Sequence, residues 1–142
     1  MTVAIVNALL PRMENIEPKD EADRLEMENI RSEAKALKAM CYFDLLRLYG
    51  PVYSEANLSK DGIILKHRLE LDFLPRSSVK DCADEIEKLL TDALKADNSD
   101  AEVFYLSTPA VKALLAEFET LSRLCGRWWC EHPWCSNLRY GV

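Results

Sequence analysis

The sequence has few residues that break helices, with four glycines and six prolines among its 142 residues. It has no run of five basic residues and carries a net charge of −6, so the positive surface typical of nucleic-acid-binding proteins is missing. No apolar run reaches the roughly 20 residues that a membrane-spanning helix needs. These absences exclude a membrane-spanning chain, argue against nucleic acid as a partner and favour a helical protein.

The composition is that of a globular protein, since 49% of the residues are apolar and 30% are charged. A chain of this length is expected to form one domain. Its apolar start, residues 2–10, lacks the basic leader of a signal peptide, so the sequence predicts neither a signal nor a lipidated cysteine in this chain.

Apolar periodicity predicts two helices in the first third of the chain. Residues 2–15 form a short one, which Pro11 is expected to end or kink. Residues 21–49 form a long one, ended by Gly50 in the left-handed conformation and by Pro51. Side chains three and four residues apart predict the buried stripe of the long helix: Ile30, Ala34, Leu37, Cys41, Leu45 and Leu48.

Two further helices are predicted nearer the C-terminus. Ser78, with Asp81 three residues later, is a good N-cap for a helix that reaches about residue 96. Thr108 and Pro109 start another, which ends at Gly126. A short polar connection makes these two helices an antiparallel hairpin of the kind that is stacked in helical repeats.

The connection between the long helix and the next one contains an alternating pattern. From Leu65 to Phe73 apolar residues and His67 alternate with charged residues. A period of two predicts a half-buried strand in a small β-hairpin, with His67 packed on its apolar side.

Three segments, in this order and spacing, resemble the SusD/RagB family of nutrient-uptake proteins. The first, SEAKALKAMCYFDLLRLYGPV at residues 32–52, is similar to the family's signature helix. The second is LPRSSV at 74–79, which leads into EIEKLLTDA at 85–93, and the third is STPAVKALLA at 107–116. The family pattern fails after about Glu117. The resemblance therefore divides the chain into a SusD-like region, residues 1–119, and a divergent tail, residues 120–142.

The resemblance implies a mainly α fold of tetratricopeptide-like helical hairpins. The alternating pattern adds to this fold a small β-hairpin in the connection between the second and third helices. It also implies a non-catalytic protein that binds an oligosaccharide or another nutrient, needs no cofactor and, in its intact form, partners a TonB-dependent transporter. Such proteins are surface lipoproteins of the outer membrane. The unusual tail suggests the hypothesis that this chain is a truncated family member whose last residues are read out of frame.

Candidate site residues are few, and none of them is catalytic. Sugar recognition uses aromatic faces and amide groups on loops held by a rigid scaffold, so Tyr53 and Asn57 after the signature helix are the candidate ligand-binding residues. An ordinary solvated loop is the alternative. In the tail, a zinc site is an alternative to free thiols, and its four ligands would be Cys125, Cys130, His132 and Cys135.

A second function class fits the same helices. A small tetratricopeptide-like module could bind another protein in a groove between helices. Under the SusD-like interpretation, the missing remainder of the family fold is expected to leave apolar faces of the helices 21–49 and 108–126 uncovered, which predicts self-association of this chain.

Overall fold

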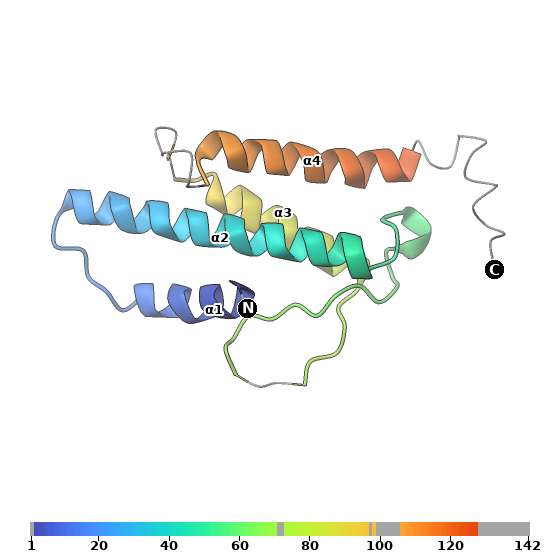
Figure 1. Ribbon diagram of the computed structural model, residues 1–142, viewed down its shortest axis with the longest axis horizontal. Helices are drawn as coiled ribbons and strands as arrows, with labels where there is room; N and C mark the ends of the chain where they lie inside the picture. Colours follow the sequence, from blue (N-terminus) through green and yellow to red (C-terminus); the bar gives the residue numbers. More distant parts are fainter. Residues whose placement is uncertain (1, 71–72, 97, 99–105, 128–142) are drawn as a thin grey trace.

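The computed structural model describes residues 2–70, 73–96, 98 and 106–127, without the side chains of 122–127. These residues form the helices α1 (Thr2–Met13), α2 (Glu21–Tyr49), α3 (Val79–Ala93) and α4 (Thr108–Arg127), and the short 3-10 helix η1 (Glu55–Asn57). Successive α-helices run in opposite directions, so that α1 and α2 form one hairpin and α3 and α4 another (Figure 1). The prediction of a mainly α fold is confirmed.

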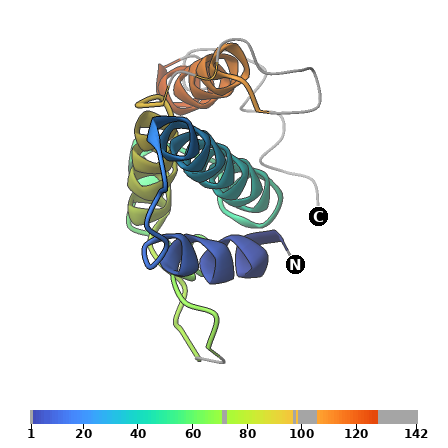
Figure 2. The same ribbon diagram turned by 90° about the vertical axis from the view of Figure 1, so that its left-hand side faces the viewer.

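The long helix α2 is the centre of the molecule. It contacts each of the other three α-helices and packs most extensively against α3. Seen along the long axis, α1 and α4 lie on opposite sides of α2, and α3 lies beside it (Figure 2). One flank of α2 therefore has no helix of the described chain against it.

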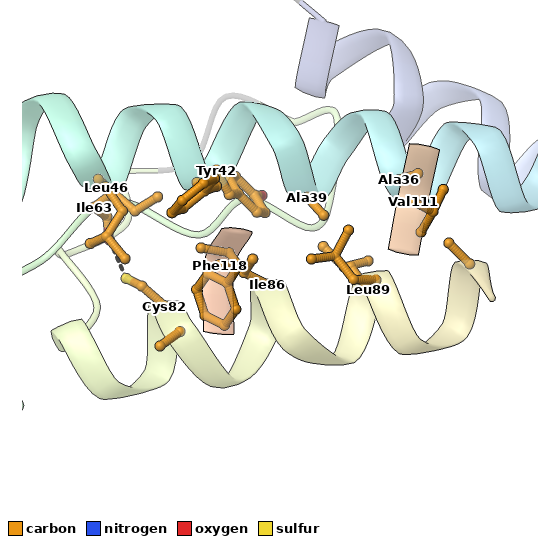
Figure 3. Close-up of a cluster of buried hydrophobic side chains, with 14 residues drawn as sticks. Ala36, Ala39, Tyr42, Leu46, Ile63, Cys82, Ile86, Leu89, Val111 and Phe118 are labelled. Carbon is orange, nitrogen blue, oxygen red and sulfur yellow. Dashed lines mark hydrogen bonds between the residues drawn. The ribbon is translucent and has the colours of Figure 1, made fainter. Parts of the chain in front are cut away.

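The hydrophobic core lies where α2, α3 and α4 meet. Small side chains at Ala36 and Ala39, both fully buried, allow α3 to approach α2 closely (Figure 3). The rings of Phe43 and Phe118 join α2 to α4 edge to face, with 5.5 Å between their centroids. Other core side chains come from all three helices and from the loop before α3: Tyr42, Leu46, Ile63, Cys82, Ala83, Ile86, Leu89, Leu90, Ala93 and Val111.

Half of the six residues predicted to form the buried face of α2 are exposed, and Leu37 and Cys41 are half-buried. Ala34 is buried, but Leu48 is 70% exposed, Ile30 40% and Leu45 38%. The helix carries a second apolar face, built around Ala39, Tyr42 and similar side chains, and this second face meets α3 and α4. The two faces have the same helical spacing, so periodicity alone does not distinguish them.

Helix ends agree with the predictions more closely. The Asp20 side chain accepts a hydrogen bond from the amide of Asp23 at 2.8 Å, and helix α2 spans the predicted residues. At the start of α3, Ser78 Oγ accepts from the amide of Asp81 at 3.1 Å. Helix α3 ends at Ala93, three residues before its predicted end.

Two predictions about helix breakers are corrected. Pro11 does not end α1, which continues to Met13, because a proline removes only the hydrogen bond of its own amide and only two helical residues follow it. Gly50 is extended, with φ −89° and ψ 163°, and not left-handed. Glycine is needed there for space, since a Cβ atom would lie 2.6 Å from the carbonyl oxygen of Leu46.

The β-hairpin predicted between α2 and α3 is absent, and the described residues contain no strand, only a single antiparallel bridge between Asp61 and Ser78. Side chains take the place of a partner strand. The backbone of Lys66 donates to Tyr42 Oη at 2.9 Å and accepts from it at 2.6 Å, and it also accepts from Asn7 Nδ2 at 2.8 Å. His67 is 57% exposed at its side chain, so the prediction that it packs on an apolar face is wrong.

Length and hydropathy decide whether a helix could cross a membrane. Within the described residues, none of the helices combines the length and the apolar character needed to cross a bilayer.

Candidate functional site

The loop that follows α2 turns back and lies along the start of α3. It begins at Pro51, passes through η1 and reaches the buried residue Ile63. Asn57 Nδ2 donates to the carbonyl oxygen of Val52 at 2.9 Å, which closes the loop on itself. This loop, residues 51–63, contains both predicted ligand-binding residues.

Backbone hydrogen bonds fasten the loop to α3. The first amides of a helix have no partner within the helix. Here the amide of Val79 donates to the carbonyl of Lys60 at 2.9 Å, and the amide of Lys80 donates to the carbonyl of Leu58 at 3.0 Å. The loop is therefore the cap of α3, and the helix holds the loop in place.

Close packing adds to this attachment. The amide of Gly62 donates to the carbonyl of Ser77 at 2.8 Å, and the amide of Ser77 donates to the carbonyl of Ile63 at 2.9 Å. A Cβ atom on Gly62 would meet the Sγ of Cys82 at 3.0 Å, so the backbone passes directly over α3. Burial raises the pKa of the Cys82 thiol, which lies 3.6 Å from the Ile63 carbonyl oxygen (Figure 3).

Tyr53 is the aromatic side chain of the loop. It is half-buried and packs against the edge of the hydrophobic core. Burial raises the pKa of Tyr53, and the carboxylates of Asp84 and Glu87 on α3 raise it further while Lys80 opposes them. Its hydroxyl makes no hydrogen bond to the described part of the chain. The ring is thus held in place while its polar end is available to a ligand.

Asn57, the second predicted residue, is placed differently. Its amide nitrogen is used by the Val52 carbonyl, which leaves the Oδ1 oxygen as an acceptor. No hydrogen bond joins Asn57 to Tyr53. The structure therefore brings the two residues onto one loop, and gives Asn57 a role in shaping that loop.

A second polar cluster lies between α2, α3 and the segment before α3. Lys38 is buried, with its Nζ 5.6 Å from the centroid of the Tyr42 ring. Burial lowers the pKa of Lys38, and the charge of Glu85 opposes that shift. Glu85 Oε1 also lies 3.7 Å from Nδ1 of His67. The contact between His67 and Glu85 joins the segment around Lys66 to α3.

The sequence did not predict a pocket of about 300 Å³ between the N-terminal half of α2 and the C-terminal end of α3. It is open to solvent, and we call it the polar cavity because most of its lining residues are charged. Ser32 and Lys35 line it from α2, and Asp92 and Lys95 line it from the other side. A buried serine within the apolar pattern of α2 was the available signal, but the facing residues are about 60 positions away in the sequence.

The described residues hold no group of three or more histidine, cysteine, aspartate and glutamate side chains that could bind a metal ion. Cys41 and Cys82 are free thiols. Of the four alternative zinc ligands, Cys130, His132 and Cys135 lie outside the described residues, and Cys125 lies on α4 where side chains are not described.

A family model decides what the chain is related to. The SusD-like model, described as starch-binding and associating with the outer membrane, matches residues 1–124. The chain belongs to the SusD-like family. This confirms the resemblance seen in the sequence, and members of the family are non-catalytic carbohydrate-binding proteins. A comparison with curated proteins finds no match.

Solved structures share the fold of this SusD-like chain. A putative sugar binding protein from Bacteroides vulgatus superposes with a TM-score of 0.80 and 22% identity over 86% of the chain. A SusD superfamily protein from Bacteroides thetaiotaomicron gives 0.77 and 23% over 85%. A SusD-like protein from Bacteroides fragilis gives 0.65 and 22% over 99%. The SusD-like chain covers 28%, 27% and 26% of these three proteins, respectively.

Proposed function

We propose that this SusD-like chain is the helical scaffold of a glycan-binding protein that acts in nutrient uptake at the outer membrane. The family match over residues 1–124 is the observation that carries the proposal, because its description names both starch binding and the outer membrane. The similarity to a putative sugar binding protein supports the same function.

The loop 51–63 is the part of the scaffold best suited to touch a glycan. Its ends are fixed by α2 and by the first turn of α3, so little order is lost when a ligand binds. Tyr53 offers an aromatic ring to the apolar face of a sugar, and Asn57 Oδ1 offers an acceptor to a hydroxyl group. Both groups bind and neither performs a reaction.

The remaining parts of the proposal concern the intact protein. A surface lipoprotein of this kind would capture an oligosaccharide and deliver it to a TonB-dependent transporter. Because the chain spans about a quarter of its solved relatives, further contacts to the glycan would come from the rest of the relatives' fold.

Calorimetry with a panel of neutral oligosaccharides tests the proposal. We expect the chain to bind at least one of them, and Tyr53→Ala to weaken that binding about tenfold, since a stacked aromatic ring contributes on the order of 1 kcal/mol or more. Tyr49→Ala removes an exposed tyrosine of α2 and serves as the matched control. Absence of binding, or equal losses in the two variants, would contradict the role of the loop.

One observation favours the alternative of a protein-interaction module. The side chains of Leu45, Leu48 and Tyr49 near the end of α2 are exposed together, and apolar patches of this kind are typical of protein interfaces. Loss of a protein partner in Leu48→Glu, with no glycan bound by the unmodified chain, would favour this function over the first.

A further inference from the structure

The polar cavity described above is separate from the loop that contains Tyr53. It lies at the C-terminal end of α3, whereas the loop caps the N-terminal end, and 15 helical residues set the two about 20 Å apart. Its volume of about 300 Å³ is at the lower end of the range for small-ligand pockets. Its walls come from both helices and the turn after α3: Glu28, Arg31, Ser32, Lys35, Asp92, Lys95 and Ala96.

The charges of the cavity leave one cation without a partner. Asp92 pairs with Lys35 Nζ at 3.3 Å and with Lys95 Nζ at 2.6 Å. These lysines, above all the hydrogen bond from Lys95, lower the pKa of Asp92 and keep it ionised. The guanidinium of Arg31 makes no hydrogen bond or ion pair with the described residues. Three cations and two carboxylates line the cavity, so it is net positive in a chain of net charge −6.

Ser32 gives the cavity a fixed wall. It is buried, and its Oγ donates a hydrogen bond to the carbonyl of Ala93 at the end of α3. The hydroxyl oxygen keeps lone pairs that can accept a further hydrogen bond. This contact ties α2 to α3 on one side of the cavity, and the Lys35–Asp92 ion pair ties them on another.

We propose that this cavity binds a carboxylate-bearing sugar, a uronic acid residue of a glycan. Arg31 would pair with the sugar carboxylate in the two-bond geometry that guanidinium groups favour. Glu28 Oε1 is paired with Arg24 Nη1 at 3.2 Å, so its Oε2 and the carboxylate of Asp92 would accept hydrogen bonds from ring hydroxyls. A neutral sugar leaves Arg31 unpaired. The inference rests on the proposed glycan-binding function and specifies a second, acidic subsite for it.

Amide chemical shifts of the full chain, followed by NMR during titration, test the inference. The probes are glucuronic acid, glucose and acetate. We expect glucuronic acid to shift the amides around Arg31, Lys35 and Ala96. Arg31→Gln should weaken this binding about tenfold or more, the loss expected for a charge-assisted pair. Arg12→Gln removes an exposed arginine of α1 and is the matched control.

The inference is overturned if glucose binds the cavity as tightly as glucuronic acid, if acetate does so, or if Arg31→Gln leaves binding unchanged. Neutral oligosaccharides distinguish this failure from failure of the proposed function. When they bind in a Tyr53-dependent way while glucuronic acid leaves the cavity amides unshifted, only the acidic subsite is rejected. When none of the sugars binds, both proposals are rejected.

Discussion

The two apolar faces of α2 meet different surroundings. One face, containing Ala39, Tyr42 and Phe43, is covered by α3 and α4. The other, which we call the open stripe, consists of Ile30, Leu45 and Leu48 and is substantially exposed. The covered face has smaller or aromatic side chains that fit closely against neighbours, whereas the open stripe has the more typical aliphatic residues. The face of α2 that is buried is therefore determined more by how well its side chains pack against the neighbouring helices than by how hydrophobic they are.

The largest expected effect on stability comes from truncating a buried side chain on the covered face. Phe43→Ala removes a buried ring that touches Phe118, and we expect the free energy of unfolding to fall by about 3–5 kcal/mol. Leu48→Ala on the open stripe should change it by less than about 0.5 kcal/mol. Urea denaturation measures both. Similar losses in the two variants would remove the distinction between the faces.

Removal of the Tyr42 hydroxyl, on the covered face of α2, is expected to have a smaller effect on the free energy of unfolding. Tyr42→Phe leaves the amide of Lys66 without its side-chain partner, and it removes one of the two donors to the Lys66 carbonyl, the other being Asn7 Nδ2. We expect the free energy of unfolding at pH 7 to fall by about 1–3 kcal/mol.

The same hydroxyl predicts a dependence on pH. Burial raises the pKa of Tyr42 to about 12, and the unfolded chain ionises near its usual value of about 10. The stabilisation is therefore complete well below pH 10 and is lost as the pH rises through 12, by up to about 3 kcal/mol. Lys38 acts in the opposite direction, because its pKa is lowered by burial. Both the wild type and Tyr42→Phe contain Lys38, so the difference between their free energies of unfolding reports on the tyrosine alone. If these free energies changed in parallel with pH, the prediction would be refuted.

The smallest effect on unfolding, but a clear effect on assembly, is expected at the open stripe. We expect the chain to self-associate at high concentration through these exposed leucines. Leu48→Glu should restore a monomer in light scattering, while Thr91→Glu adds the same charge on an exposed part of α3 and should not. A monodisperse wild-type monomer would contradict self-association.

The local features of this fold could be predicted from the sequence, and the features that depend on distant residues could not. Ser78 caps α3 through Asp81, only three residues away, so the pattern and the hydrogen bond occupy the same short segment. The segment around Lys66 depends on Asn7 and Tyr42, 59 and 24 residues away. Its alternating pattern therefore predicts a strand that the described residues do not form.

The candidate sites divide in the same way. Tyr53 and Asn57 could be named because an aromatic and an amide follow the recognisable end of a helix. The cavity could not, because Arg31 and Asp92 are polar residues of ordinary solvated helix faces until α2 and α3 pack together. Only the tertiary arrangement identifies Arg31 as a cation that lacks a partner.

The attachment of the loop to the start of α3 makes two backbone amides natural reporters of ligand binding. Val79 and Lys80 can exchange their hydrogens with water only when their bonds to Lys60 and Leu58 open. Loop opening and fraying of the first helical turn are thus one event. A glycan that holds the loop closed would slow hydrogen exchange in α3, at residues that it never touches.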